Sequence, residues 1–338
     1  MTDKTYMNLC IELAKKGIPK AFPNPLVGCM IVYNNTIIGK GYHKQYGESH
    51  AEVNAIESIE DKSCLKNSTL YVTLEPCSHF GKTPPCVDLI LAHQIPKVVI
   101  GCLDTFSKVN GLGIQRLKEA GVEVITSVLK NECRQLNRRF FTFHEKKRPY
   151  ILLKWAKSAD GYIAPLNQHK PFWLTAKDAK KMVHQWRSEE GAILVGKNTV
   201  LNDNPLLTTR EVSGKNPIRL VIDKKRSLDK RQFAIFNTEA DTLVINDSLD
   251  DDMHIKVDFS SFVDSLMRGL YSRNIQSVIV EGGAQTLQTF IEANCWDEAR
   301  VFISTKRLEK GLQSPVFEHS AKKTKHLNED TLHYYYNL

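Results

Sequence analysis

The 338-residue sequence contains no long apolar segment. No run approaches the roughly eighteen apolar residues that a membrane-spanning helix needs, so we expect no membrane partner. The chain starts Met-Thr-Asp-Lys-Thr without an apolar stretch behind it, and a secretory signal is not expected. We find no internal repeat and no low-complexity segment. These absences favour an ordinary globular protein of the cytoplasm.

Basic blocks interleaved with aromatic residues are also absent. The net charge is +8, but the lysines and arginines are spread along the chain. Dispersed positive charge favours attraction to small phosphorylated ligands over binding to a polynucleotide. We therefore predict a phosphorylated small-molecule substrate and no nucleic-acid partner.

The eight cysteines show none of the paired spacing found in disulfide-bonded secreted domains. This usage suits a reducing compartment. Six of them give no signal that we can interpret: Cys10, Cys29, Cys64, Cys102, Cys133 and Cys295. Cys77 and Cys86 differ, because of the residues around them.

Two separated segments carry the chemistry of a zinc deaminase. One is His50-Ala51-Glu52, and the other runs from Pro76-Cys77 to Cys86. An imidazole and two thiols supply three zinc ligands, which leaves the fourth position for water. Zinc lowers the pKa of that water, and a carboxylate two residues after the histidine can carry the proton to the leaving amine. We predict zinc ligands His50, Cys77 and Cys86, one ion per domain, with Glu52 as the catalytic acid and base.

The spacing of the two cysteines is unusual for a deaminase signature. Such signatures place the cysteines two residues apart, whereas eight residues separate Cys77 from Cys86. Gly81, Pro84 and Pro85 make the intervening segment rich in turn formers, so the chain can return to the metal. A structural zinc site and two unconnected buried thiols are the alternatives. The absence of an evident fourth ligand favours catalytic zinc.

Apolar periodicity predicts an α/β fold in the first half of the chain. A helix is expected from Tyr6 to Gly17, and the segments Val27–Tyr33 and Ile37–Ile38 read as a hairpin around Asn34-Asn35. His50 opens a helix in which Val53, Ile56 and Ile59 are expected to face inward. The remaining elements are strands Thr69–Leu74, Lys97–Gly101 and Val122–Ile125, and helices Val87–Ala92, Ile114–Ala120 and Asn131–His144.

A basic stretch ending at Pro149 interrupts this pattern, and we place a domain boundary there. The predicted domains are residues 1–146 and 147–338. The second half repeats the alternation of strands and helices. Its predicted strands are Tyr150–Trp155, Ala192–Val195, Arg219–Ile222, Thr242–Ile245, Val278–Val280, Arg300–Ile303 and Leu332–Tyr336, and its helices are Asp178–Arg187, Phe262–Tyr271 and Ala284–Ala293.

These motifs resemble those of the bifunctional riboflavin-biosynthesis proteins. That family joins a diaminohydroxyphosphoribosylaminopyrimidine deaminase to a 5-amino-6-(5-phosphoribosylamino)uracil reductase. The resemblance extends from residue 5 to residue 305. Its most specific segments are Pro23–Gly28, His50–Ala55, Thr73–His79, Thr83–Cys86, Leu194–Gly196 and Thr199–Arg210. It implies a cytidine-deaminase-like α/β/α domain followed by a dihydrofolate-reductase-like α/β domain that uses NADPH.

The resemblance also implies roles for individual residues. In the deaminase half it places four residues at the pyrimidine or its ribose phosphate: Asn24, His43, His79 and Lys82. In the reductase half it places six at the cofactor: Lys157, Trp173, Thr199, Asp203, Gly283 and Ala284. Five more are implied to contact the substrate of reduction: Lys154, Arg187, Leu207, Arg210 and Glu281. Guanidinium groups suit a phosphate because they donate two parallel hydrogen bonds.

The sequence departs from the family pattern at several positions. The run Asp104–Gly113 keeps its glycines but lacks the prolines usual between its ends. In the second half the departures are Ala159, Pro171, Phe172 and Asn204, and the tail after Ser304 lacks a glycine-rich pattern. Reduction is thus less firmly predicted than deamination.

We expect two consecutive reactions: hydrolytic deamination of 2,5-diamino-6-ribosylamino-4(3H)-pyrimidinone 5′-phosphate, then NADPH-dependent reduction of its ribosyl group to ribityl. Lys154 and Asp203 are the candidates for proton transfer in the second step. The alternatives are a tRNA or DNA base deaminase, which uses the same zinc ligands, a deaminase with an inactive reductase domain, and a zinc-stabilised interaction module. A two-domain enzyme of this kind is expected to form a homodimer or homotetramer.

Overall fold

The structure is a computed structural model that describes residues 1–78, 84–105, 111–166 and 172–337. The chain divides into two compact units, Met1–Lys146 and Lys147–Leu338, which we describe separately. This division falls within the basic stretch before Pro149. Within the described ranges, no helix is both long and apolar enough to cross a membrane.

The first unit is built on a five-stranded sheet with the order β2-β1-β3-β4-β5, counted over the described residues. Strands β1 (Gly28–Tyr33) and β2 (Thr36–Tyr42) form the predicted hairpin, and both Asn34 and Asn35 adopt the left-handed backbone that such a tight turn requires. Strands β3 (Thr69–Leu74), β4 (Lys97–Cys102) and β5 (Glu123–Ile125) are parallel. Their carboxyl ends therefore share one edge of the sheet.

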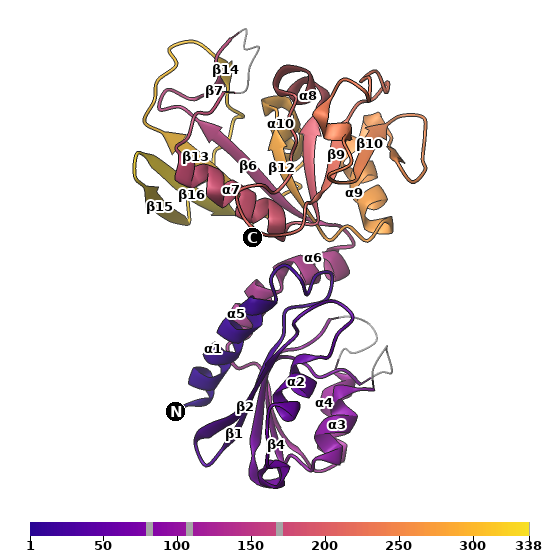
Figure 1. The fold of residues 1–338 in the computed structure, drawn as a ribbon, viewed down its shortest axis with the longest axis vertical. Helices are drawn as coiled ribbons and strands as arrows, with labels where there is room; N and C mark the ends of the chain where they lie inside the picture. Colours follow the sequence, from indigo (N-terminus) through magenta and orange to yellow (C-terminus); the bar gives the residue numbers. More distant parts are fainter. Residues whose placement is uncertain (79–83, 106–110, 167–171, 338) are drawn as a thin grey trace. The chain divides into compact units, whose positions relative to one another are not determined.

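Helices cover both faces of this sheet (Figure 1). On one face, α1 (Asp3–Ala14) and α5 (Lys130–Leu136) pack over the strands through Tyr6, Met7 and Cys133. On the other face lie α2 (Ala51–Glu57), α3 (Cys86–Ala92) and α4 (Leu112–Glu119). In α2 the buried residues are Ala51, Glu52, Ala55 and Ile56, so the inward position predicted for Val53 is only half-buried.

One predicted helix is wrong: residues 131–144 form two helices instead. The first is α5, and the second is α6 (Arg138–Lys146). Asn137 separates them. Its side-chain oxygen accepts from the Leu26 N–H at 2.7 Å, and its side-chain nitrogen donates to the Leu26 carbonyl at 2.9 Å. This pairing joins the turn between the helices to the Asn24-Pro25-Leu26 segment, which the sequence periodicity could not indicate.

The second unit contains a nine-stranded sheet among its described residues, with the order β11-β10-β9-β8-β12-β6-β13-β16-β15. The strands from β11, at one edge, to β13 are parallel: β6 (Tyr150–Lys157), β8 (Ala192–Gly196), β9 (Ile218–Ile222), β10 (Thr242–Asn246), β11 (His254–Lys256), β12 (Ser277–Gly282) and β13 (Glu298–Ser304). Strands β15 (Lys323–Leu327) and β16 (Asp330–Tyr336) add an antiparallel hairpin at one edge.

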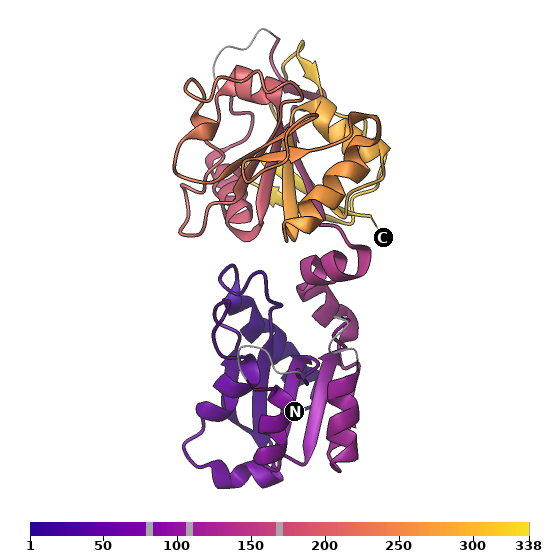
Figure 2. The same ribbon diagram turned by 90° about the vertical axis from the view of Figure 1, so that its right-hand side faces the viewer.

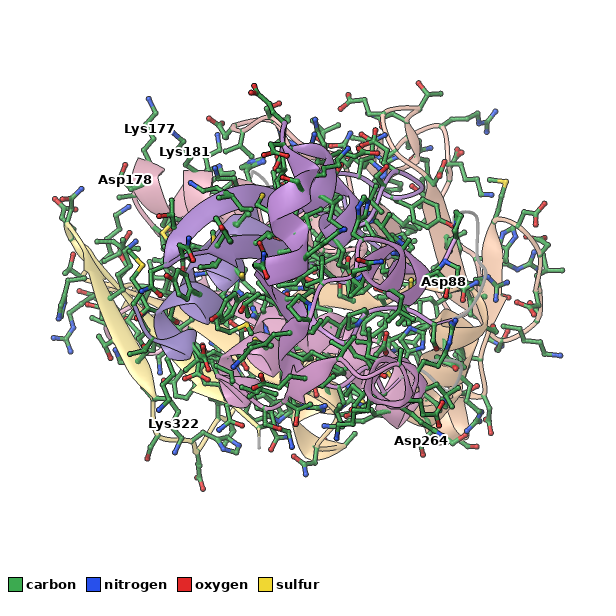
Figure 3. The ribbon with its side chains drawn as sticks, turned by 90° about the horizontal axis from the view of Figure 1, so that it is seen from below. Asp88, Lys177, Asp178, Lys181, Asp264 and Lys322 are labelled. Atoms are coloured by element: carbon green, nitrogen blue, oxygen red, sulfur yellow. The ribbon has the colours of Figure 1, made fainter. Side chains whose placement is uncertain are left out.

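Helices again cover both faces, as the two views of this unit show (Figures 1 and 2). Helix α7 (Lys177–Glu189) packs against one face through Val183 and Trp186. Helices α9 (Phe262–Ser272) and α10 (Ala284–Glu292) cover the other. The outward face of α7 is charged, and the side chains of Lys177, Asp178 and Lys181 point away from the helix (Figure 3). The α/β class predicted for both halves is confirmed.

The sequence analysis did not identify the shorter elements of this unit. These are strands β7 (Tyr162–Ala164) and β14 (Leu312–Gln313), which pair with each other, the edge strands β11 and β15, and helix α8 (Lys197–Asp203). Strand β15 has the sequence Lys-Thr-Lys-His-Leu and is almost entirely exposed. Because it lacks an apolar face, it gives no period-two signal.

Candidate active sites

His50, Cys77 and Cys86 come together at one end of the first unit. The Nδ1 atom of His50 lies 3.3 Å from Sγ of Cys86 and 3.5 Å from Sγ of Cys77. Tetrahedral zinc with bonds of about 2.3 Å to sulfur and 2.0 Å to nitrogen places such atoms roughly 3.5 Å apart. The three ligand atoms therefore fit zinc. Across the described residues, they are the one group of histidine, cysteine and acidic side chains close enough to share a metal ion.

The fold places two of these ligands at the starts of helices and the third after a strand. His50 is the residue before α2, and Cys86 is the first residue of α3. Cys77 follows β3 by three residues, and the backbone N–H of Cys86 donates to its sulfur at 3.3 Å. Hydrogen bonds of this kind favour a thiolate. The thiol of Cys86 also donates a hydrogen bond to the Cys77 sulfur, which lowers the pKa of Cys77 well below its usual range.

Glu52 is buried beside these ligands, with 3% of its surface exposed. Burial raises the pKa of Glu52 to about 7, although the neighbouring His50 opposes the shift. A carboxyl group of this kind can both take and return a proton near neutral pH. Its position on the first turn of α2 follows directly from its place two residues after His50.

Asn24 and His43 are hydrogen-bonded to each other beside the predicted metal ligands. Nδ1 of His43 lies 3.1 Å from the Ser49 carbonyl, so that nitrogen carries the proton and donates. The other ring nitrogen, Nε2, then accepts from the Asn24 side-chain amide at 3.1 Å. The His43 and His50 rings meet edge to face, with centroids 5.7 Å apart. The other two residues predicted at the pyrimidine, His79 and Lys82, lie outside the described residues.

The second unit brings three of its predicted site residues into one buried cluster. Arg187, on α7, donates through Nε and Nη2 to the two carboxylate oxygens of Glu281 at 2.8 and 2.7 Å. Nζ of Lys154, on β6, lies 3.7 Å from the same carboxylate. Burial alone would raise the pKa of Glu281, but the charges of Arg187 and Lys154 outweigh it and lower that pKa to about 2. Glu281 is therefore ionised between two cations.

Arg210 joins this cluster through Thr208. Its Nη1 donates to the Thr208 hydroxyl at 3.0 Å, and Arg187 Nη1 lies 3.4 Å from the Thr208 carbonyl. The backbone N–H of Arg210 donates to Nδ1 of His184, a fully buried residue of α7. The sequence analysis missed His184, although it stands one turn before Arg187 on the same helix. That spacing is the signal that could have identified it.

Glycines allow close packing where α8 and α10 begin. Gly196 precedes α8, and a side chain there would lie 2.7 Å from the Thr286 hydroxyl. Gly282 has a φ of 129°, which favours glycine, and a side chain on Gly283 would lie 3.5 Å from the Thr199 hydroxyl. The predicted cofactor residues Thr199 and Gly283 thus lie near each other, and Ala284 is the first residue of α10.

Other predicted residues of the second unit lie apart from the ion-pair cluster. Lys157 ends β6 on the face opposite Lys154, because side chains alternate along a strand. Trp173 is half exposed, with the Lys180 ammonium 5.1 Å from its ring centre. Asp203 ends α8, and Leu207 is buried with a left-handed backbone.

Two of the departures from the family pattern have a structural explanation. Asn204 follows α8 with a φ of 39°, a backbone that asparagine tolerates well, and its side-chain oxygen accepts from the Ala234 N–H at 2.7 Å. Ala159 lies in a turn where its own side chain is not needed, because Ser158 and Asp160 make the hydrogen bonds. Phe172 is exposed, and Pro171 lies outside the described residues.

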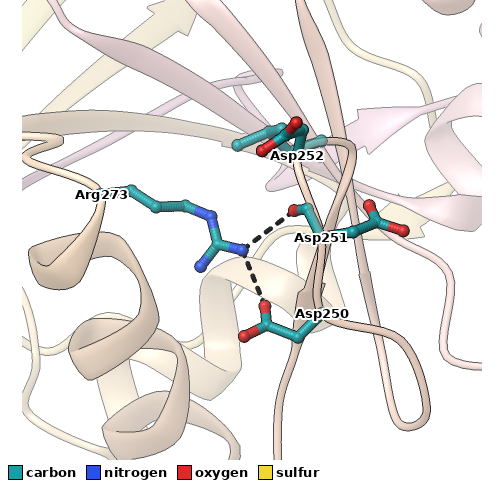
Figure 4. A pocket seen from close by; sticks show the side chains of 5 residues that line it. Asp250, Asp251, Asp252 and Arg273 are labelled. Atoms are coloured by element: carbon teal, nitrogen blue, oxygen red, sulfur yellow. Dashed lines mark hydrogen bonds and ion pairs between the residues drawn. The ribbon is translucent and has the colours of Figure 1, made fainter.

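A hollow of about 460 Å³ lies elsewhere in the second unit, lined by Leu243, Asp250, Asp251, Asp252 and Arg273. Arg273 donates to the Asp250 carboxylate at 2.7 Å and to the Asp251 carbonyl at 3.1 Å (Figure 4). None of the predicted site residues lines it. This hollow therefore takes no part in the two sites described above.

Comparison with known proteins defines the class of each half. Residues 1–102 match the cytidine and deoxycytidylate deaminase zinc-binding region, and residues 149–332 match the RibD C-terminal domain. The chain is thus a zinc-binding deaminase domain joined to a reductase domain. The riboflavin biosynthesis protein RibD of Aquifex aeolicus is 39% identical over 319 residues, covering 92% of this chain and 89% of that protein.

Other relatives also match this chain over most of its length. The Escherichia coli RibD protein is 34% identical over 330 residues, covering 91% of this chain and 89% of that protein. A diaminohydroxyphosphoribosylaminopyrimidine deaminase/5-amino-6-(5-phosphoribosylamino)uracil reductase from Thermotoga maritima has a solved structure that superposes with a TM-score of 0.90 at 38% identity, covering 98% of this chain and 97% of that one. The chain belongs to the RibD family of riboflavin biosynthesis proteins, as its motifs predicted.

Proposed function

We propose that the first unit catalyses zinc-dependent hydrolytic deamination of 2,5-diamino-6-ribosylamino-4(3H)-pyrimidinone 5′-phosphate. The observation that carries this proposal is the meeting of the His50 nitrogen with two cysteine sulfurs beside a buried carboxylate. His50, Cys77 and Cys86 would hold the zinc, which supplies an acidified water when bound. The family membership supports the same reaction.

Glu52 moves the proton in this reaction. It takes a proton from the attacking water and delivers it to the departing amino group, so that the carbon–nitrogen bond breaks and ammonia leaves. Its carboxylate lies on the first turn of α2, two residues after the predicted ligand His50. His43 and Asn24, which are fixed by their mutual hydrogen bond, bind the pyrimidine beside the metal ligands.

The second unit, we propose, reduces the ribosyl group of the deaminated product with NADPH. Two cations, Lys154 and Arg187, contact the single carboxylate of Glu281, and a third, Arg210, bonds to the neighbouring Thr208. This excess of positive charge suits a substrate phosphate. Gly196 and Gly283 let the starts of α8 and α10 approach each other closely, and the backbone N–H groups at the N-terminus of α10 suit the diphosphate of the cofactor.

When bound, NADPH would supply a hydride for the ribose carbon that is bonded to the ring amine, and the sugar would open to ribityl. The ring oxygen that is released needs a proton. Lys154 can supply it, because burial lowers the pKa of Lys154. The chain's other contributions are to fix the phosphate and to exclude water.

One incubation tests both proposals. The purified chain is loaded with zinc and given the phosphoribosylated diaminopyrimidine, with and without NADPH, and the products are resolved by mass. We expect exchange of the amino group for oxygen without NADPH, and a further gain of two hydrogens with it. Zinc bound without ammonia release would refute the deaminase, and unchanged NADPH absorbance with the deaminated substrate would refute the reductase.

A further inference from the structure

The segment that carries Cys77 is held by the start of α4 as well as by its own strand. Strands β3 and β4 are parallel neighbours, with Leu74 opposite Cys102. The chain beyond each strand therefore emerges at the same edge of the sheet, and the Glu75 N–H donates to the Cys102 carbonyl at 3.0 Å. Residues after β4 can thus contact the residues around Cys77.

Glu75 makes the first of these contacts. Its carboxylate is 3% exposed and accepts three backbone N–H groups. Oε2 accepts from Asp104 at 3.3 Å and from Gly111 at 3.0 Å, and Oε1 accepts from Gly113 at 3.1 Å. All three donors belong to the run Asp104–Gly113, which lacks the family's prolines.

Gly113 explains how α4 comes so close. A side chain at this position would lie 2.4 Å from the Pro76 carbonyl oxygen and 3.2 Å from Oε1 of Glu75. Only glycine permits the first turn of α4 to lie directly against the residues that lead to Cys77. The helix start and the Glu75-Pro76-Cys77 segment are therefore in backbone contact.

Arg116, one turn further along α4, contacts the segments of both predicted thiol ligands. Its Nη1 donates to the carbonyl of Ser78, the residue after Cys77, at 3.1 Å. Its Nη2 lies 2.5 Å from the carboxylate of Asp88 on α3, two residues after Cys86. Figure 3 labels Asp88 on this helix. A single guanidinium thus connects the two cysteine-bearing segments.

We propose that Glu75 and Arg116 are positioning residues of the deaminase site, which set the separation of the Cys77 and Cys86 sulfurs through α4. This proposal rests on the proposed zinc site. We call their contacts the α4 brace. Neither side chain touches the metal or the substrate in this role; both act through the backbone next to the thiols.

The chemistry of each residue is specific. Glu75 needs two acceptor oxygens, because its three donors approach both of them, and glutamine would turn an N–H₂ group toward at least one donor. Arg116 needs two nitrogens that point to different partners, whereas lysine has one. Glu75→Gln and Arg116→Lys therefore weaken the α4 brace while almost preserving side-chain volume.

The experiment compares these variants in the zinc-loaded full-length chain. Exposed residues of α4 provide matched controls: Glu119→Gln for Glu75→Gln, and Lys118→Ala for Arg116→Ala and Arg116→Lys. Three quantities are measured: the rate of zinc release to excess chelator, kcat and KM for ammonia release, and reduction of the deaminated substrate. Reduction takes place in the other unit and reports whether the chain as a whole is intact.

We expect zinc release to be about tenfold faster, and kcat for ammonia release about tenfold lower, in Glu75→Gln and Arg116→Ala. Arg116→Lys should fall between Arg116→Ala and Lys118→Ala, and reduction should stay within about twofold in every variant. If Glu75→Gln and Arg116→Ala release zinc as slowly as their controls, the proposal is wrong.

Two further outcomes are also decisive. If Glu75→Gln does not retain a folded first unit, the ranking of Arg116→Ala, Arg116→Lys and Lys118→Ala decides alone, because Arg116 is partly exposed and its loss leaves the core intact. If the unmutated chain binds zinc but releases no ammonia, the proposed deamination fails, while the zinc-release rates still test the α4 brace.

Discussion

The two units concentrate opposite kinds of charge. In the first, two cysteine sulfurs and the Glu52 carboxylate gather around a single imidazole. When these thiols and this carboxyl group are ionised, the four side chains together carry an excess of negative charge. In the second, Lys154 and Arg187 lie against the single carboxylate of Glu281, and Arg210 adds a third positive charge through its hydrogen bond to Thr208. A buried charge is costly unless it is paired. The first arrangement therefore calls for a bound cation and the second for a bound anion.

The units also differ in how their sites are assembled. The three predicted zinc ligands lie within 37 residues of sequence: His50 and Cys86 at the starts of α2 and α3, and Cys77 just after β3. The cationic site draws on β6, α7, the segment around Thr208 and the end of β12, which are far apart in the chain. A substitution in one unit should leave the other unit's chemistry intact, and this independence makes the comparison testable.

The largest expected effect is the loss of deamination in Glu52→Gln. Removing the group that moves the proton should lower kcat for ammonia release by about 1,000-fold or more. Zinc content should remain at one ion per chain, and the reduction of deaminated substrate should not change. Glu57→Gln, at the exposed end of α2, is the control. Substantial turnover in Glu52→Gln would contradict the mechanism.

The next largest effect is expected for Glu281→Gln in the second unit. This change leaves Lys154 and Arg187 buried without their carboxylate, which should cost about 3–5 kcal/mol of stability. Reductase kcat/KM should fall roughly 100-fold, because the cations no longer hold their positions. Glu292→Gln, on the exposed end of α10, controls for the loss of charge. An equal loss of deamination would show that the units are not independent.

A smaller effect concerns pH and again separates the units. Burial, with the nearby charges of Arg187 and Arg210, lowers the pKa of His184 to about 4. The unfolded chain, where the pKa of histidine is ordinary, binds more protons between that value and about pH 6.5. The second unit should therefore lose roughly 1–3 kcal/mol of stability as pH falls through this window.

Fluorescence can follow this loss in one unit, because all four tryptophans, Trp155, Trp173, Trp186 and Trp296, lie in the second unit. Urea unfolding monitored by tryptophan emission at several pH values measures how steeply the free energy of unfolding changes with pH. His184→Asn keeps an acceptor for the Arg210 N–H but cannot titrate, so its slope should be flatter. Equal slopes in the two proteins would exclude His184 as the source.

The smallest expected effect is that of Asn204→Asp, which restores the residue frequent in the family. Aspartate keeps the acceptor for the Ala234 N–H and tolerates the left-handed backbone, so stability should change by less than about 1 kcal/mol. Asn204→Ala, which lacks the acceptor, should cost about 1–2 kcal/mol. NADPH oxidation and thermal unfolding measure both variants. A large gain in reduction with Asn204→Asp would mean that this departure weakens the enzyme.

Much of the fold could be predicted from local patterns. Strand β3 has the bounds that were expected, and most other long elements differ by one to three residues, because buried strands and amphipathic helices carry their periodicity in the sequence. The exceptions depended on distant partners. Asn137 interrupts a good helical pattern to bind Leu26, and β7 becomes a strand only because β14 pairs with it.

The site could be predicted where its chemistry restricts residue types. Zinc in proteins is often bound by thiols and imidazole, so His50, Cys77 and Cys86 could be predicted as a ligand set, and the structure brings these three side chains together. Glu75, Arg116 and His184 gave no comparable signal, because carboxylates, guanidiniums and histidines have many structural uses. Their importance becomes visible only from what they touch: three backbone N–H groups, two cysteine-bearing segments and the N–H of Arg210.

The Asn137–Leu26 pairing sets the minimum length at which the first unit can be cut out and produced alone. The zinc-binding family match ends at Cys102, but a fragment truncated there would lose α5 and α6. The N–H and carbonyl of Leu26 would lose their partner, and the core residues Cys133 and Phe141 would be missing from beneath α1. A usable expression boundary therefore lies after Lys146, more than forty residues beyond the recognisable motif.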